Sequence, residues 1–85
     1  MNEIIKIKLL NDYYICLKFK DGVTKTINFR PFIGKGFTRE ILNPEYFKKV
    51  RIESGGGLTW PNGYDFCPDF LKDYVEDEEL VMNRK

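Results

Sequence analysis

The residues that could carry out chemistry in this chain lie close together near its carboxyl end. Cys67 stands before Pro68 at an expected helix start, where the helix dipole favours the nucleophilic thiolate. Asp65 and Asp69 form a carboxylate pair that could divide acid and base roles. The chain has no histidine, the commonest proton shuttle near neutral pH. Because Cys67 lacks a visible base, we predict no catalytic residue, no metal site and no cofactor, and we expect a protein that is not an enzyme.

Three consecutive glycines, Gly55 to Gly57, suggest a phosphate-binding loop at first sight. A P-loop needs a following Gly-Lys-Ser/Thr and a helix amino terminus, and a dinucleotide-binding loop needs spaced glycines that lead into a helix. Here Leu58-Thr59-Trp60 follows, which is typical of a strand. We therefore predict a flexible hairpin loop.

The segment Trp60-Pro61-Asn62-Gly63-Tyr64-Asp65 contains the only tryptophan and a turn sequence. We expect Trp60 and Phe66 to fill the core while Asn62-Gly63 turns the chain. Asp65 either bonds the turn amides or presents a carboxylate to a partner beside an exposed ring. The candidate partner-binding residues are Trp60, Asn62, Asp65, Glu76, Asp77, Glu78 and Glu79.

The charge of the chain is strongly divided, although the net charge is only +1. Residues 1–51 contain eleven basic and five acidic side chains, and residues 52–85 contain three basic and eight acidic ones. In one interpretation the lysines cover a solvated face of the sheet, and the acids lie at the start and along the flank of the terminal helix. The other is a basic face that attracts an acidic partner or nucleic acid. The candidate nucleic-acid face consists of Lys6, Lys8, Tyr14, Lys18, Lys20 and Lys25.

Eighty-five residues, 42% of them hydrophobic and 15% aromatic, suffice for one domain, with an ordered core at about 3–75 and a charged tail at 76–85. Cys16 and Cys67 have no CxxC partner, so we expect reduced thiols, with a single disulfide between them as the alternative. No run reaches the length of a bilayer span, and the first residues do not resemble a signal peptide. We expect a soluble, cytoplasmic protein.

Alternation with period two predicts strands in the amino-terminal half. Ile5, Ile7 and Leu9 are expected to share one apolar face, and Tyr13 to Phe19 continue the pattern in a second strand. Asn11-Asp12 and Asp21-Gly22 are tight-turn pairs, and Asp-Gly suits a type I′ hairpin. Val23, Ile27 and Phe29 predict a third strand.

Proline and glycine mark the change to helical segments after Arg30-Pro31. Thr38 can cap a short turn through Leu42, and Asn43-Pro44 is a cap followed by proline at the first helical position. The last helix begins at Cys67-Pro68, with its inner stripe at Phe70, Leu71, Tyr74 and Val75. We predict an α+β fold, an antiparallel β-meander of about five strands with two or three short helices in a single domain.

Three features together resemble a known family: Phe19-Lys20-Asp21-Gly22, Phe47 before Val50, and the tryptophan segment followed by Pro68 and Leu71. Over residues 3 to 75 the chain resembles the bacterial domain of unknown function 2442. The resemblance implies an α+β domain with no established catalytic activity. It also implies relatives with a carboxy-terminal helix-turn-helix, which we do not expect here, and relatives that are paired with small toxins as antitoxins.

We therefore expect a non-enzymatic interaction or regulatory module, the antitoxin-like member of a two-protein pair. Its contact surfaces would be an exposed sheet edge and the acidic run at 76–79, which could meet a small basic toxin. Self-association through the same edge is a second outcome. The alternatives are nucleic-acid binding by the lysine face and a small enzyme that uses Cys67 or the carboxylate pair.

Overall fold

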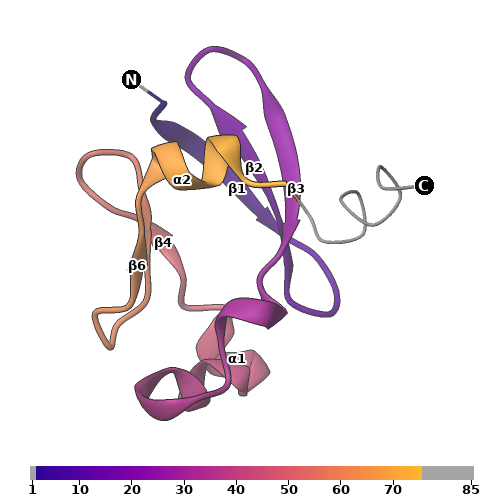
Figure 1. The fold of residues 1–85 in the computed structure, drawn as a ribbon, viewed down its shortest axis with the longest axis vertical. Helices are drawn as coiled ribbons and strands as arrows, with labels where there is room; N and C mark the ends of the chain where they lie inside the picture. Colours follow the sequence, from indigo (N-terminus) through magenta and orange to yellow (C-terminus); the bar gives the residue numbers. More distant parts are fainter. Residues whose placement is uncertain (1, 76–85) are drawn as a thin grey trace.

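The computed structural model describes residues 2–75, so the predicted tail at 76–85, including Glu76 to Glu79, lies outside the described residues (Figure 1). The elements in chain order are β1 (Ile4–Leu9), β2 (Tyr14–Phe19), β3 (Thr24–Asn28), the 3₁₀ helices η1 (Arg30–Phe32) and η2 (Gly36–Leu42), α1 (Pro44–Phe47), β4 (Arg51–Ile52), β5 (Leu58–Thr59), β6 (Asp65–Phe66) and α2 (Pro68–Asp73).

The strands form two antiparallel sheets of three strands each, in the orders β1-β2-β3 and β4-β5-β6. The α+β class is confirmed, but the single five-strand meander is wrong. Two features account for the difference. The helical segment at 30–47 separates the first three strands from the rest, and the two-residue strand β6 is too short to show alternation. In Figure 1 the two sheets face each other, with α2 near one end of the gap and α1 near the other.

A bulge in β1 changes which of its side chains enter the core. Ile4 pairs with Phe19 and Lys6 pairs with Lys18, so Ile5 is the extra residue between them. Ile4 is 2% exposed whereas Ile5 is 52% exposed. The prediction that Ile5 faces the core is therefore wrong, because a β-bulge interrupts the period of two.

Three hairpins use the same three-residue loop. Phe19 and Val23, Glu53 and Gly57, and Trp60 and Tyr64 each flank such a loop, in which the first residue's N–H donates to the last residue's carbonyl. The third loop position is Gly22, Gly56 or Gly63, with φ between 91° and 94°. In the first of these loops only Gly22 is left-handed, so Asp21-Gly22 is not the predicted type I′ pair but part of a glycine-closed three-residue loop.

The two left-handed residues of the β1–β2 turn are Asp12 and Tyr13, with φ of 59° and 70°. The Tyr14 N–H donates to the Asn11 carbonyl at 3.2 Å, which makes them the central pair of a type I′ turn. Positive φ is costly for an aromatic residue. Tyr13 is held there by its hydroxyl, which donates to the Leu42 carbonyl, and by an edge-on contact with Phe47 at 5.2 Å.

The helix starts follow the capping signals in part. Asn43 Oδ1 accepts from the Glu45 N–H at 2.9 Å, as predicted, and α2 begins at Pro68. Thr38, however, lies inside η2, which begins at Gly36, and its hydroxyl donates to the Lys35 carbonyl at 2.7 Å. In α2 only Leu71 is buried. The predicted stripe is confirmed only in part: Tyr74, in the extended segment after α2, is half-buried against the core, whereas Phe70 and Val75 are exposed, the latter because α2 ends at Asp73.

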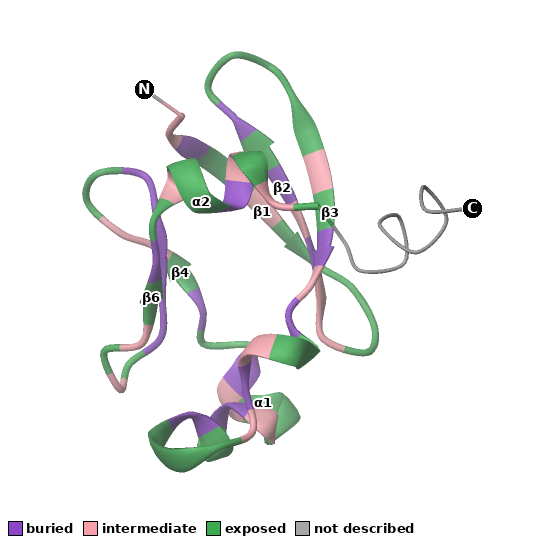
Figure 2. Cartoon of the chain, viewed as in Figure 1, coloured by how far each residue is buried: buried purple, intermediate pink, exposed green. Residues whose placement is uncertain are grey.

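The core lies between the sheets, where the buried residues gather (Figure 2). Trp60 is 1% exposed and contacts Phe29 and Phe66 at ring distances of 6.1 and 6.0 Å. Gly57 is also enclosed, because a Cβ there would stand 2.3 Å from the Phe66 carbonyl oxygen. The glycine triplet is thus partly packed against the strands and is not an open loop.

A candidate interaction surface on the first sheet

Trp60 and Asn62 of the tryptophan segment form hydrogen bonds with other parts of the same chain. The Trp60 indole Nε1 donates to the Phe47 carbonyl at 3.0 Å, so both the ring and its polar atom are occupied. Asn62 donates to the Phe37 carbonyl and to Glu40 Oε2, both at 3.0 Å, and accepts from the Tyr64 N–H. The prediction of Trp60 as core is confirmed, and its candidacy as a partner contact is wrong because the ring is covered.

The residues considered for catalysis lie on β6, at the residue before α2 and in α2. Asp65 is exposed on β6, Cys67 is exposed before α2, and Asp69 in the first turn of α2 accepts from the Asn2 amide at 2.9 Å. Cys16 and Cys67 are both free thiols. Within residues 2–75 no group of three or more Cys, Asp or Glu side chains could hold a metal ion. In the same range, every buried side-chain nitrogen and oxygen has a hydrogen-bond partner.

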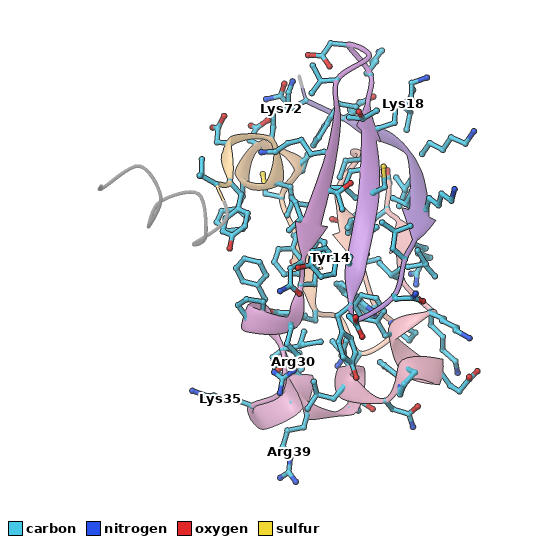
Figure 3. All side chains as sticks on the ribbon, turned by 90° about the vertical axis from the view of Figure 1, so that its right-hand side faces the viewer. Tyr14, Lys18, Arg30, Lys35, Arg39 and Lys72 are labelled. Carbon is cyan, nitrogen blue, oxygen red and sulfur yellow. The ribbon has the colours of Figure 1, made fainter. Side chains whose placement is uncertain are left out.

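The outer face of the first sheet presents a cationic surface, which faces the viewer in Figure 3. Lys6 lies directly opposite Lys18, and Lys8 lies opposite Cys16. Tyr14 shares this face and is partly exposed. Directly opposed residues have Cβ atoms about 5 Å apart, where like charges destabilise a sheet. Among residues 2–75 none of these three lysines forms an ion pair.

We define the lysine face as Lys6, Lys8 and Lys18 together with Tyr14, and we add three side chains that sequence reasoning missed. Thr24, Thr26 and Asn28 of β3 pair with Lys18, Cys16 and Tyr14 and so point to the same side. Their position could have been predicted from the sequence, because residues 24, 26 and 28 alternate with the apolar Ile27. In Figure 3, Arg30, Lys35 and Arg39 lie below Tyr14, at the end of the molecule that carries η1 and η2.

Lys25 does not belong to the lysine face. It pairs with Leu17, which is fully buried, so its side chain points to the inner side of the sheet. There its Nζ donates to the carbonyls of Leu71, Lys72 and Tyr74 at 3.1, 2.7 and 2.6 Å. The prediction is wrong because Lys25 lies two residues before the buried Ile27 in β3, so the two side chains point to the same, inner side of the sheet. A cation that bonds the last carbonyls of a helix stabilises its carboxyl end. Lys20 follows β2 and approaches Glu3 at 3.9 Å.

The outer edge of β1 is covered only at its start, where the Ile4 N–H donates to the Gly56 carbonyl at 2.9 Å and β4 packs near β1, and the open part of the edge lies at residues 7–9. The Leu10 N–H donates to the Tyr14 carbonyl at 2.9 Å. Hydrogen-bonded and non-bonded pairs alternate in an antiparallel ladder, so Lys8 also bonds β2 while Ile7 and Leu9 direct their N–H and C=O groups outward. Three apolar side chains in or just beyond this strand are exposed, namely Ile5 at 52%, Leu9 at 37% and Leu10 at 41%.

A groove of about 280 Å³ continues from the end of β1. It is lined by the turn residues 9–13 and by Pro44, Phe47 and Lys48. This volume suits one or two side chains better than a cofactor, because drug-sized ligands occupy roughly 300–1,000 Å³. Sequence reasoning missed the groove. One feature of the sequence could have indicated it: Leu10 follows Leu9 directly, which breaks the alternation of apolar and polar residues in β1.

Charged contacts hold α2 on the first sheet. Lys72 Nζ lies 2.7 Å from Asp21 Oδ2, and the same ammonium stands 5.1 Å from the centre of the Phe19 ring. The hydrogen bond from Lys72, followed by that from the Val23 N–H, holds the pKa of the Asp21 carboxyl below its ordinary value of 3.8. Burial raises the pKa of Tyr64, whose hydroxyl donates to the Phe32 carbonyl at 2.6 Å.

These features define a small α+β domain with a partly open sheet edge and a cationic sheet face. The chain belongs to the family described as protein of unknown function DUF2442, whose model matches residues 4–77. The resemblance seen in the sequence is thereby confirmed. No curated protein and no solved structure matches the chain. Within residues 2–75, no helix combines the length and the apolar character that crossing a membrane requires.

Proposed function

We propose that this domain is a non-catalytic protein-interaction module whose contact surface is the β1 edge together with the lysine face. The observation that carries the proposal is the outward-directed backbone of Ile7 and Leu9 beside exposed apolar side chains. Free N–H and C=O groups on an edge strand are a ready template for a partner strand.

The particular role that we propose is the regulatory, antitoxin-like member of a two-protein pair in the cytoplasm. The resemblance to relatives that are paired with small toxins supports the role, and two free cysteines support a reducing compartment. The acidic run expected to meet a basic toxin lies outside the described residues. The described body carries twelve basic and nine acidic side chains, so its own surface suits an acidic partner segment.

Site-specific photo-crosslinking in living cells tests the contact surface. A photoreactive residue in place of Lys8 on the β1 strand should yield a covalent adduct with one defined protein. The matched probe replaces Lys49, which is exposed in the segment after α1. Adducts from position 49 with none from position 8 would contradict the proposal.

Nucleic-acid binding is a second candidate, which one observation favours: Tyr14 shares a face with three lysines that form no ion pair within residues 2–75. Proteins that bind single strands combine such cations with a stacking ring. Lys25 points to the inner side of the sheet, so the face offers one cation fewer to a nucleic acid than predicted. Titration with a labelled single-stranded oligonucleotide at two salt concentrations tests it, since phosphate contacts give affinity that falls steeply with salt.

A further inference from the structure

The occupant of the β1 edge can be specified further, on the basis of the proposed function. We infer that β1 accepts an extended segment of a partner protein in which acidic and apolar residues alternate. This segment forms a fourth strand of the first sheet, antiparallel to β1. Its carboxylates lie over Lys6 and Lys8, and its apolar side chains lie beside Ile7 and Leu9.

The charge pattern selects an acidic strand. Lys6 and Lys18 oppose each other with no acid in ion-pair contact among the described residues, which leaves an unfavourable pair on the outer face. A partner carboxylate next to Lys6 relieves this repulsion. Cross-strand pairs of opposite charge stabilise a sheet by a few tenths to about 1 kcal/mol each.

The same pattern disfavours a second copy of this chain as the occupant. A symmetric antiparallel pair centred on Ile7 sets Lys6 against Lys8 of the other copy, and centring on Lys6 or Lys8 sets each lysine against itself. The bulge at Ile5 and the two lysines are devices by which edge strands avoid self-pairing. They leave the edge open to a strand of opposite charge.

Residues 7–9 of the β1 edge, beyond the bond from the Ile4 N–H to the Gly56 carbonyl, are a better acceptor than the β3 edge of the sheet. The segment that follows α2 reaches β3, where the Tyr74 carbonyl accepts from Lys25 (Figure 1). β1 instead ends at the groove lined by Leu9, Leu10 and Phe47. An apolar side chain at the end of the partner segment fits this groove and fixes the register of pairing.

The alternation of β1 also predicts which partner amides matter. Ile7 and Leu9 supply the outward backbone groups, so the partner residues opposite them form the hydrogen-bonded pairs. Those residues share the inner face with Ile7 and Leu9 and are therefore the apolar ones. The amides of the acidic residues point away from β1.

A short peptide of alternating glutamate and valine is the probe for this inference, with amide chemical shifts of the protein as the readout. Binding should shift the amide signals of Ile7 and Leu9 more than those of Thr24 and Thr26. N-methylation of the valines should abolish binding, whereas N-methylation of the glutamates should leave it intact. The variant Lys6→Glu/Lys8→Glu should bind at least about tenfold more weakly, because two attractive contacts become repulsive.

The matched control is Arg39→Glu/Lys49→Glu, which changes the net charge equally at two exposed residues outside the sheet and should bind the peptide normally. Equal binding of a lysine-valine peptide, or persistent binding after valine methylation, overturns the inference. So does an oligonucleotide that shifts the lysine face when the peptide does not. If the peptide fails to bind while crosslinking from position 8 succeeds, the inference is wrong and the proposed function stands. Failure of both refutes both.

Discussion

Individual side chains show where residue type alone is informative. Trp60 was predicted as core because a lone indole beside a turn and a second ring seldom stays exposed, and it lies among Phe29, Phe47 and Phe66. Lys25 was misplaced because charge suggested the outer face. Its position in β3 outweighs its charge, and three backbone carbonyls make that position favourable.

Trp60→Ala should lower the free energy of unfolding by about 3–5 kcal/mol, because a large ring leaves a cavity in a packed core. Trp60→Phe keeps most of the ring and loses the bond to the Phe47 carbonyl, so a smaller loss is expected. Urea denaturation followed by circular dichroism measures both. Equal, small losses in the two variants would show that the indole is not core filling.

Lys25→Met should destabilise the domain by about 1.5–3 kcal/mol, since three charged hydrogen bonds to α2 and the segment after it disappear. Lys18→Met is the control and should change stability by less than about 0.5 kcal/mol, because Lys18 is exposed. Amide exchange near Leu71 should accelerate only in the first variant. Unchanged exchange there would show that Lys25 does not hold α2.

At the scale of elements, the strands and turns with strong local signals were predicted, and those set by pairing were not. The first three strands follow from alternation, and α1 follows from Asn43-Pro44. The bulge at Ile5, the strand β6 and the end of α2 at Asp73 depend on tertiary contacts that leave no local pattern. The sequence therefore predicts that the sheet has an exposed edge, but not that this edge is β1.

The contact between Asp21 and Lys72 should make stability depend on pH. The folded pKa of Asp21 lies below 3.8, so its stabilisation is present above the unfolded value and is lost as pH falls through the folded value. Asp21→Asn removes this dependence. Urea midpoints of both proteins should therefore differ at pH 6 and converge as the pH falls through the folded pKa of Asp21. A difference that persists at the acidic end would contradict the assignment.

Gly57→Ala should destabilise the second sheet, because a methyl group would meet the Phe66 carbonyl at 2.3 Å. The strand pair β5–β6 must separate to admit it, which costs on the order of 1–3 kcal/mol. Ser54→Ala, at an exposed position of the same hairpin, is the control. A thermal midpoint equal to that of the control would mean that this loop is as loose as its composition suggests.

For the whole molecule, two small sheets enclose one aromatic core, and the charged surface is left outside that core. Because the lysines of β1 oppose symmetric pairing, the protein should sediment as a 10.1 kDa monomer at low salt. Analytical ultracentrifugation provides the mass. A dimer that the Lys6→Glu/Lys8→Glu variant no longer forms would show that the edge serves self-association instead.

Amide hydrogen exchange along β1, followed by NMR in the free protein and with its crosslinked partner, shows whether this edge is open and whether the partner covers it. The Ile7 and Leu9 amides should exchange rapidly in the free protein while Lys8 and Leu10 are protected, and the partner should slow Ile7 and Leu9 as well. Protection of Ile7 and Leu9 already in the free monomer, or no slowing when the partner binds, would contradict the proposed role of the β1 edge.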